Sequence, residues 1–147
     1  MIRNTLVRTP SGAKAITELK SGDLVCNEFG KPVMVKEVIS RGKESVVDIL
    51  VSGQPWATCT KDSRWLVKEC CGPKQAIMDV KKVSDFSTSN RIIAVMEGKP
   101  FGFGFSVTLA DTNDEEETIS SYKGAFDLDI ESDTNLYLLA NGLVAHS

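Results

Sequence analysis

Short apolar segments separated by turn-forming residues run along most of this chain. Turn signals recur about every eight to twelve residues, and the segments between them are rich in Val, Ile, Thr and aromatic side chains, which is typical of an all-β protein. We expect strands at residues 5–9, 24–26, 32–40, 45–51, 56–60, 65–67, 92–96, 125–130, 135–140 and 143–145, and turns at 10–12, 27–30, 41–43 and 60–63. In the first strand, the alternation of side chains predicts that Leu6 points inward.

Helical spacing is limited to two short stretches. Residues 16–19 have it over a single turn, and four apolar residues between 76 and 83 stand three and four positions apart, which predicts a short helix. The segments 16–25 and 80–93 also echo each other weakly. Each reads as a short turn, a polar loop and then a strand.

Two further features mark the second half of the chain. In residues 98–121, a run of Phe alternating with Gly predicts a strand with room for bulges or close approach, and the acidic run TNDEEET follows. We expect the acidic run to be a solvated loop, with a partner site as the alternative. Asn141-Gly142 is the strongest hairpin signal, so residues 143–145 are expected to fold back as the last strand.

Length and composition exclude several classes of protein. The 147 residues are 41% hydrophobic and 25% charged, which predicts one soluble domain that needs no disulfide or metal to hold its core. The net charge of −3 argues against non-specific nucleic-acid binding, which needs a basic face. The sequence shows neither a membrane span nor a secretion signal, and its four irregularly spaced cysteines fit reduced thiols in the cytoplasm.

The single histidine limits the catalytic chemistry. Zinc sites built on two or three histidines are excluded, and any Ser/His or Cys/His pair must use His146. Among the thiols, Cys59 is interpreted as core, because alternation along a strand turns it away from the neighbouring Thr60. Cys70-Cys71 reads as part of a turn.

The two ends of the sequence resemble the two ends of an intein. NTLVRTPSGAKAITELKSGDLV at 4–25 is similar to the family's opening pattern of T-x-V, a T-x-x-G turn, I-x-x-L and G-D-x-V. FDLDIESDTNLYLLANGLVAHS at 126–147 resembles the closing pattern of a Y-D-L-x-V strand, an apolar strand, N-G and a terminal His-Asn. Between them, ATCTKDSRWLV at 57–67 resembles the T-x-x-H segment. Three blocks therefore occur in the family's order.

This resemblance implies a fold and an activity. The fold is the Hint fold, an all-β horseshoe of two pseudo-symmetric halves whose termini lie close together in the centre. Inteins splice themselves out without a cofactor: residue 1, a Cys or Ser, attacks the preceding carbonyl, the first residue after the intein takes over the acyl chain, and the terminal Asn cyclises. A chain of this length holds no homing endonuclease, which makes it a mini-intein with 98–121 as the place of an insertion or natural split.

At the N-terminal junction, the resemblance places Met1 at the nucleophile's position, where it either replaces the nucleophile or is the initiator of a trimmed chain. A thioether cannot attack a carbonyl. Thr60 matches the Thr of T-x-x-H, which helps to hold the scissile peptide, or is simply a strand residue. Ser63 takes the place of the activating His and can donate only one weak hydrogen bond. We therefore expect the first step to be absent and the activation of the amide to be weak.

Trp65 and Asp127 lie in two further family positions. A variant class of inteins, which lacks the N-terminal nucleophile, keeps a Trp at the position of Trp65. These inteins use an internal Cys where this chain has Asp127. Because Asp127 is a carboxylate, this chain does not complete that pattern, and Trp65 is interpreted as core. Asp127 matches the Asp that orients or titrates the nucleophiles, and alternation in FDLDI puts it opposite Leu128.

The C-terminal junction is also altered. His146 matches the penultimate His that polarises the last peptide. Thr134 lies near the position where many members of the family carry a second His before the last hairpin, and is a weaker substitute for it. Ser147 stands at the place of the cyclising Asn, or is the first flanking residue. In either case, Asn cyclisation cannot proceed.

The sequence therefore predicts a single Hint domain over 1–147, from a family of autocatalytic splicing elements and inactivated at positions 1, 63 and 147. We expect it to be a monomer without cofactor or metal, whose partners are flanking host (extein) segments or a complementary fragment if it is split. One alternative is an autocleaving domain of the bacterial intein-like or hedgehog type. The other is a non-catalytic β-domain that binds a protein, for which the strand at 101–105 is the nearest candidate.

Overall fold

A computed structural model describes residues 1–110, 112–113, 119–120 and 122–147, and almost all of its regular structure is β. Its elements are β1 (Leu6–Thr9), β2 (Gly12–Ala15), η1 (Ile16–Glu18), β3 (Leu24–Cys26), β4 (Pro32–Val51), β5 (Gln54–Thr60), β6 (Arg64–Glu69), β7 (Met78–Lys82), η2 (Val83–Asp85), β8 (Asn90–Met96), β9 (Lys99–Phe103), β10 (Ser106–Leu109), β11 (Thr112–Asn113), β12 (Ile119–Ser120), β13 (Tyr122–Glu131), β14 (Leu136–Leu138) and β15 (Val144–His146). Most of the acidic run, residues 114–118, lies outside the described part.

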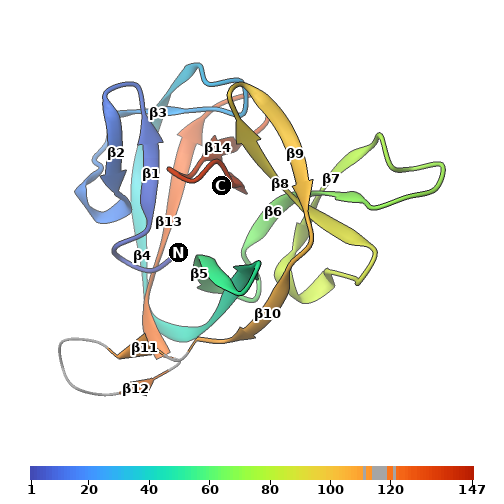
Figure 1. Cartoon of the computed structure of the whole chain (residues 1–147). Coiled ribbons are helices and arrows are strands. Elements are labelled where there is room, and N and C mark those ends of the chain that lie inside the picture. Colours follow the sequence, from blue (N-terminus) through green and yellow to red (C-terminus); the bar gives the residue numbers. More distant parts are fainter. Residues whose placement is uncertain (111, 114–118, 121) are drawn as a thin grey trace.

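Two larger antiparallel sheets organise the chain. One has the order β10-β4-β13, with β3 and β5 also paired to β4, and the other has the order β14-β15-β6-β8-β9, with β7 paired to β6. Each sheet therefore joins strands from the first and the second half of the chain, because β13 pairs with β4 and β15 pairs with β6. The strands curve around a centre in which both termini lie close together (Figure 1). This is the all-β horseshoe of the Hint fold.

The long strand β4 corrects the prediction of a turn at 41–43. The chain continues through this segment as strand, because β13 pairs with residues 34–40 before the bulge and with 43–45 after it. Farther along the same strand, β5 pairs with residues 46–51. Opposite Ala125, β4 contributes two residues, Arg41 and Gly42, and Gly42 has a φ of 75°. This is a β-bulge, which bends a strand and redirects its side chains instead of reversing it.

The two segments that are weakly similar in sequence, 16–25 and 80–93, also have similar structures. In η1 the Leu19 N–H donates to the Ile16 carbonyl at 3.3 Å, and in η2 the Phe86 N–H donates to the Val83 carbonyl at 3.1 Å. Each 3₁₀ turn buries its first residue and stands between two strands, β2 and β3 or β7 and β8. The helix predicted between 76 and 83 is wrong, because residues 78–82 form β7 and pair with β6. Pairing with a neighbouring strand overrides a helical spacing this short.

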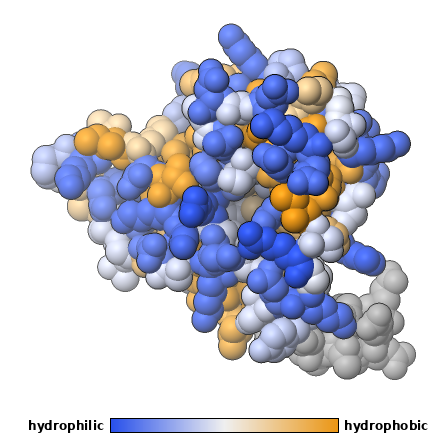
Figure 2. Space-filling model, turned by 180° about the vertical axis from the view of Figure 1, so that it is seen from behind, coloured by the Kyte–Doolittle hydropathy of each residue, from blue (hydrophilic) through white to orange (hydrophobic). Residues whose placement is uncertain are grey.

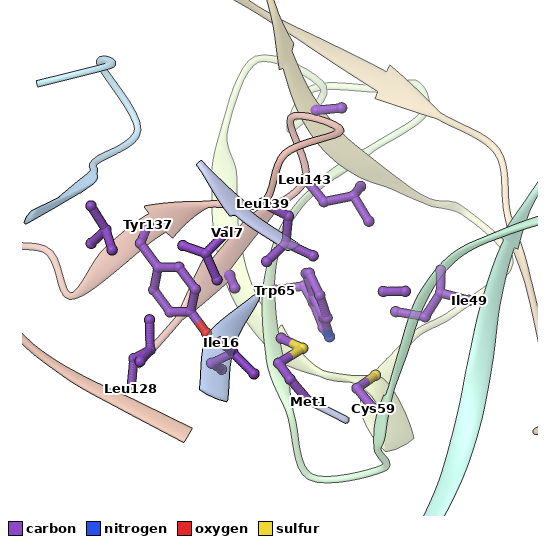
Figure 3. Close-up of a cluster of buried hydrophobic side chains, with 14 of the residues drawn as sticks. Met1, Val7, Ile16, Ile49, Cys59, Trp65, Leu128, Tyr137, Leu139 and Leu143 are labelled. Atoms are coloured by element: carbon purple, nitrogen blue, oxygen red, sulfur yellow. The ribbon is translucent and has the colours of Figure 1, made fainter. Parts of the chain in front are cut away.

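The hydrophobic core fills the space between the sheets. Trp65 and Tyr137 are its largest fully buried side chains, and Cys59 and Trp65 are both 0% exposed, as predicted (Figure 3). The prediction for the first strand is wrong by one residue: Val7 is buried and Leu6 is half exposed. Hydrophilic residues predominate on the face seen from behind, with small apolar areas between them (Figure 2). None of the described segments is a helix with the length and apolar character that crossing a membrane takes.

The hairpin predicted at Asn141-Gly142 is present and carries the last strand. The Leu139 N–H donates to the Leu143 carbonyl at 2.9 Å, and Gly142 adopts a φ of 94°. β15 then lies between β14 and β6, which brings the C-terminus to the centre of the molecule (Figure 1).

Candidate functional site

The N-terminal residue is held inside the molecule by β13. The Met1 amino group donates to the Phe126 carbonyl at 3.0 Å, and the Phe126 N–H donates to the Met1 carbonyl at 2.7 Å. Ile2 continues this pairing through a bridge to Ala125, and its N–H donates to Thr58 on β5. The backbone of residue 1 is thus fixed between β13 and β5. The Met1 side chain packs into the core beside Cys59 and Trp65 (Figure 3).

The bulge in β4 directs the Arg41 guanidinium toward Asp127 on β13. Arg41 Nε lies 2.6 Å from Asp127 Oδ2, and its second contact, Nη1, lies 3.2 Å from Asp62 Oδ2. Arg41 therefore bridges the carboxylate of β13 to the carboxylate of the turn after β5. All three groups are partly exposed, so this network orients side chains more than it stabilises the fold.

Thr60 and Ser63 meet in the tight turn between β5 and β6. The Ser63 N–H donates to the Thr60 carbonyl at 3.1 Å, and their hydroxyl oxygens are 3.0 Å apart. The Thr60 hydroxyl donates to Asp62, and this hydrogen bond, helped by Arg41, holds the pKa of Asp62 below its usual range. Since its proton goes to Asp62, the Thr60 hydroxyl is left to accept a hydrogen bond from Ser63.

The thiol of Cys59 lies on the inner side of the same turn. Burial, the largest effect, raises the pKa of Cys59 to about 11, and the nearby amino terminus, Trp65 and Ser63 lower it. The Trp65 indole nitrogen is buried and faces the space between Met1 and Cys59, without a partner in hydrogen-bond geometry among the described residues (Figure 3). At neutral pH Cys59 is therefore a protonated thiol, which is a poor nucleophile.

Burial also affects the amino group of residue 1. Desolvation lowers the pKa of the Met1 amine below its ordinary value, while Cys59 and Asp127 act in the opposite direction and Arg41 adds to the lowering. The environment therefore favours the neutral amine. A neutral nitrogen at this place suits an amide, which is what residue 1 would carry if a polypeptide segment preceded it.

His146 and Ser147 lie at the C-terminus, where β15 runs beside β6. β15 pairs Ala145 with Trp65 and His146 with Arg64, and the Ser147 N–H donates to the Asn135 carbonyl at 2.8 Å. The His146 Nδ1 atom is buried and has no hydrogen-bond partner among the described residues. Desolvation is the main cause that lowers the pKa of His146; the charge of Arg64 adds to the lowering and the Ser147 backbone opposes it, so the neutral ring is favoured at pH 7.

No hydrogen bond among the described residues joins the Thr134 side chain to another predicted site residue. Thr134 is exposed in the turn before β14, and its hydroxyl lies 3.4 Å from the Ser132 hydroxyl. The neighbouring Asn135 backbone, rather than the Thr134 side chain, contacts the C-terminus. By contrast, Met1, Thr60, Ser63 and Asp127 gather around the N-terminus.

Three residues of this region were missed by the sequence analysis. Arg41 was hidden in a predicted turn, and its contact with Asp127 depends on the register of β4 against β13. Asp62 is inside the T-x-x-S segment, where its spacing of two from Thr60 was a usable signal for a local hydrogen bond. Tyr137 is fully buried, and desolvation raises the pKa of its hydroxyl, with Asp127 contributing to the rise.

Comparisons with solved structures place the fold among inteins. The chain matches the DnaB intein from Synechocystis sp. PCC 6803 at 15% identity and a TM-score of 0.77, covering 100% of this chain and 97% of that one. For the MchDnaB-1 intein the identity is 14%, the TM-score 0.72 and the coverage 99% and 98%. For the gp41-1 intein these values are 18%, 0.69, 99% and 96%. No protein-family model and no curated protein sequence matches the chain. The chain thus has the Hint fold of these inteins over its whole length.

Proposed function

We propose that this chain is an intein-type autoprocessing domain that lacks the reacting groups for the first and last steps of protein splicing. The observation that carries the proposal is the position of the two termini. They lie close together in the centre of the fold, where residue 1 is fixed by hydrogen bonds to β13 and residue 147 by one to Asn135. Holding the reacting ends in place is the main catalytic resource of such an element.

At the N-terminal junction, the scaffold is present and the nucleophile is absent. Splicing needs a thiol or hydroxyl on residue 1 that adds to the preceding carbonyl, after which the C–N bond breaks and the amine takes the proton. Met1 has no such group. Thr60 and Ser63 supply hydroxyl groups beside the turn, and Asp127 is oriented by Arg41 within reach of the amino terminus. Ser63 in place of the activating His weakens polarisation of the scissile amide.

At the C-terminal junction, the imidazole is present and the cyclising side chain is absent. An Asn side chain would attack its own carbonyl carbon, release the following amine and leave a succinimide. Ser147 has no amide nitrogen to do so. The partly buried, neutral His146 ring stands directly before this bond and is suited to accept or donate a proton there.

The partners implied by this function are the polypeptide segments that flank the domain. A complementary fragment is a further partner if the native chain is split within 98–121. We propose that the domain acts as a monomer in the cytoplasm and that 1–147 is one mini-intein domain.

Restoring the nucleophile alone tests this proposal at the first junction. A foreign domain is fused before residue 1, and Met1→Cys is compared with the parent chain in the presence of an added thiol. We expect thiol-dependent release of the foreign domain from Met1→Cys and none from the parent. Adding Ser63→His should accelerate the release.

A matched control separates this thioester from the buried thiol nearby. Met1→Cys with Cys59→Ser should cleave as Met1→Cys does, because Cys59 is a core residue in this account. No thiol-dependent cleavage in either background, even with Ser63→His and an intact fold, would contradict the proposal. That result would favour a non-catalytic β-domain.

A further inference from the structure

A pair of adjacent thiols lies at the end of β6, far along the chain from either terminus. The Sγ atoms of Cys70 and Cys71 are 2.6 Å apart. The two sulfur atoms thus converge on each other.

The backbone around the pair supports this convergence. The Cys70 N–H donates to the Ser89 carbonyl at 2.7 Å, and the Ser89 hydroxyl donates to the Glu69 carboxylate at 2.7 Å. On the other side, Gly72 adopts a φ of 87° and its carbonyl accepts from the Gln75 N–H at 3.2 Å. The pair is therefore held between the end of a sheet and a closed turn.

The thiol pair is accessible to small molecules. Residues 70–77 belong to an arm that projects from the body of the molecule before β7 (Figure 1). Cys71 is exposed and Cys70 is partly exposed, whereas Cys26 and Cys59 are buried. Among the four thiols of the chain, the exposed one is paired with its own neighbour.

We propose that Cys70 and Cys71 form a reversible vicinal disulfide by exchange with a low-molecular-weight disulfide such as oxidised glutathione. The Cys71 thiolate attacks one sulfur of that disulfide, which forms a mixed disulfide and releases one thiol. The Cys70 thiolate then attacks Cys71 Sγ and releases the second thiol. The two cysteines lose two electrons and two protons, and the small disulfide is reduced to two thiols.

The resulting bond belongs to the labile class of disulfides. Adjacent Cα atoms across a trans peptide are about 3.8 Å apart, below the usual range of about 4.4–6.8 Å for bridged residues. The ring is therefore strained, and strained, exposed disulfides are the easily reduced, regulatory kind. The hydrogen bond between the two thiols raises the pKa of Cys71, because it favours the protonated form, so exchange should accelerate as pH rises.

Mass spectrometry of the unaltered full chain tests this site. The folded protein is equilibrated with oxidised and reduced glutathione at several ratios, quenched with an alkylating reagent, and digested after Lys68 and Lys74 to release ECCGPK. With excess oxidised glutathione, we expect this peptide to lack two hydrogen atoms and to take up no reagent. Excess reduced glutathione should restore two alkylated thiols.

Cys70→Ser and Cys71→Ser are the matched controls, because each leaves one thiol that can form only a glutathione adduct. The proposal fails if the unaltered pair remains a dithiol, or carries glutathione, at ratios that modify the single variants. A second arm repeats the equilibration in urea. The ring fraction should fall when the fold no longer holds the sulfur atoms together, and an unchanged fraction would overturn the role of the fold. Neither arm depends on splicing, so the failure of this proposal and that of the proposed function are distinguishable.

Discussion

Replacing Gly142 by Ala should destabilise the hairpin that carries the C-terminus. Gly142 has a φ of 94°, and a Cβ built there would lie 2.4 Å from the Val95 carbonyl oxygen. Gly142 also accepts a hydrogen bond from the Val95 N–H at 2.8 Å. The contact is with backbone on β8, so the hairpin must move away from that strand.

The size of the effect follows from three contributions. Left-handed backbone costs an Ala residue about 1–2 kcal/mol. Losing the hydrogen bond to Val95 costs about 1 kcal/mol, and displacing the buried Leu143 from its packing adds about 1–2 kcal/mol. We expect a loss of about 3–5 kcal/mol in the free energy of unfolding, a large share of the about 5–15 kcal/mol typical of a folded domain.

Gly98→Ala is the matched control for the backbone contribution. Gly98 has a φ of 76°, and a Cβ built there meets nothing within 4 Å. It should lose only the about 1–2 kcal/mol of left-handed strain. In urea unfolding followed by Trp fluorescence, the midpoint of Gly142→Ala should lie about 1 M or more below that of Gly98→Ala, for a slope of about 2 kcal/mol/M. Equal midpoints would refute the steric argument.

Three other predictions concern titratable groups. In a chain carrying Ser147→Asn and a following domain, His146→Ala should slow C-terminal cleavage by about 10²–10⁴-fold, measured by gel densitometry, and an unchanged rate would remove His146 from the mechanism. Arg41→Gln should raise the pKa of Asp62, measured by NMR of its carboxylate. The ionised Asp62 stabilises the fold above its unfolded pKa, and this stabilisation is lost as pH falls through the folded pKa. In Arg41→Gln the loss should therefore begin at a higher pH. Burial raises the pKa of Cys59 to about 11, so the protonated thiol contributes to the free energy of unfolding. This contribution is complete below the unfolded pKa near 9 and is lost as pH rises toward 11. Cys59→Ala should therefore flatten the fall in unfolding free energy over that window, and parallel pH profiles would contradict this.

Local signals in the sequence predicted local structure well. Asn141-Gly142 formed its hairpin because the turn needs only those two residues, and the echo between 16–25 and 80–93 corresponds to two equivalent 3₁₀ turns. The predictions failed where a distant strand decides the conformation. Residues 78–82 became strand by pairing with β6, and the 41–43 segment stayed strand because β13 pairs with β4 on both sides of the bulge.

The contrast between local signals and distant strand pairing also explains which site residues the sequence predicted and which it did not. The motifs identified Thr60, Ser63 and Asp127 because each lies in a recognisable local segment. Arg41 escaped because a bulge aims it, and the position of a bulge depends on the register between strands distant in sequence. Side-chain contacts across a sheet of this kind are not encoded in the spacing of residues along one strand.

Mass spectrometry of a chain repaired at three positions tests the central claim most directly. Met1→Cys and Ser147→Asn are combined with Ser63→His, and the domain is placed between two foreign domains, the second beginning with Cys. The account predicts a ligated product whose mass equals the two foreign domains joined by a peptide bond, together with the released 147-residue domain. An intact three-part precursor that is folded yet yields neither ligated nor cleaved product would contradict it.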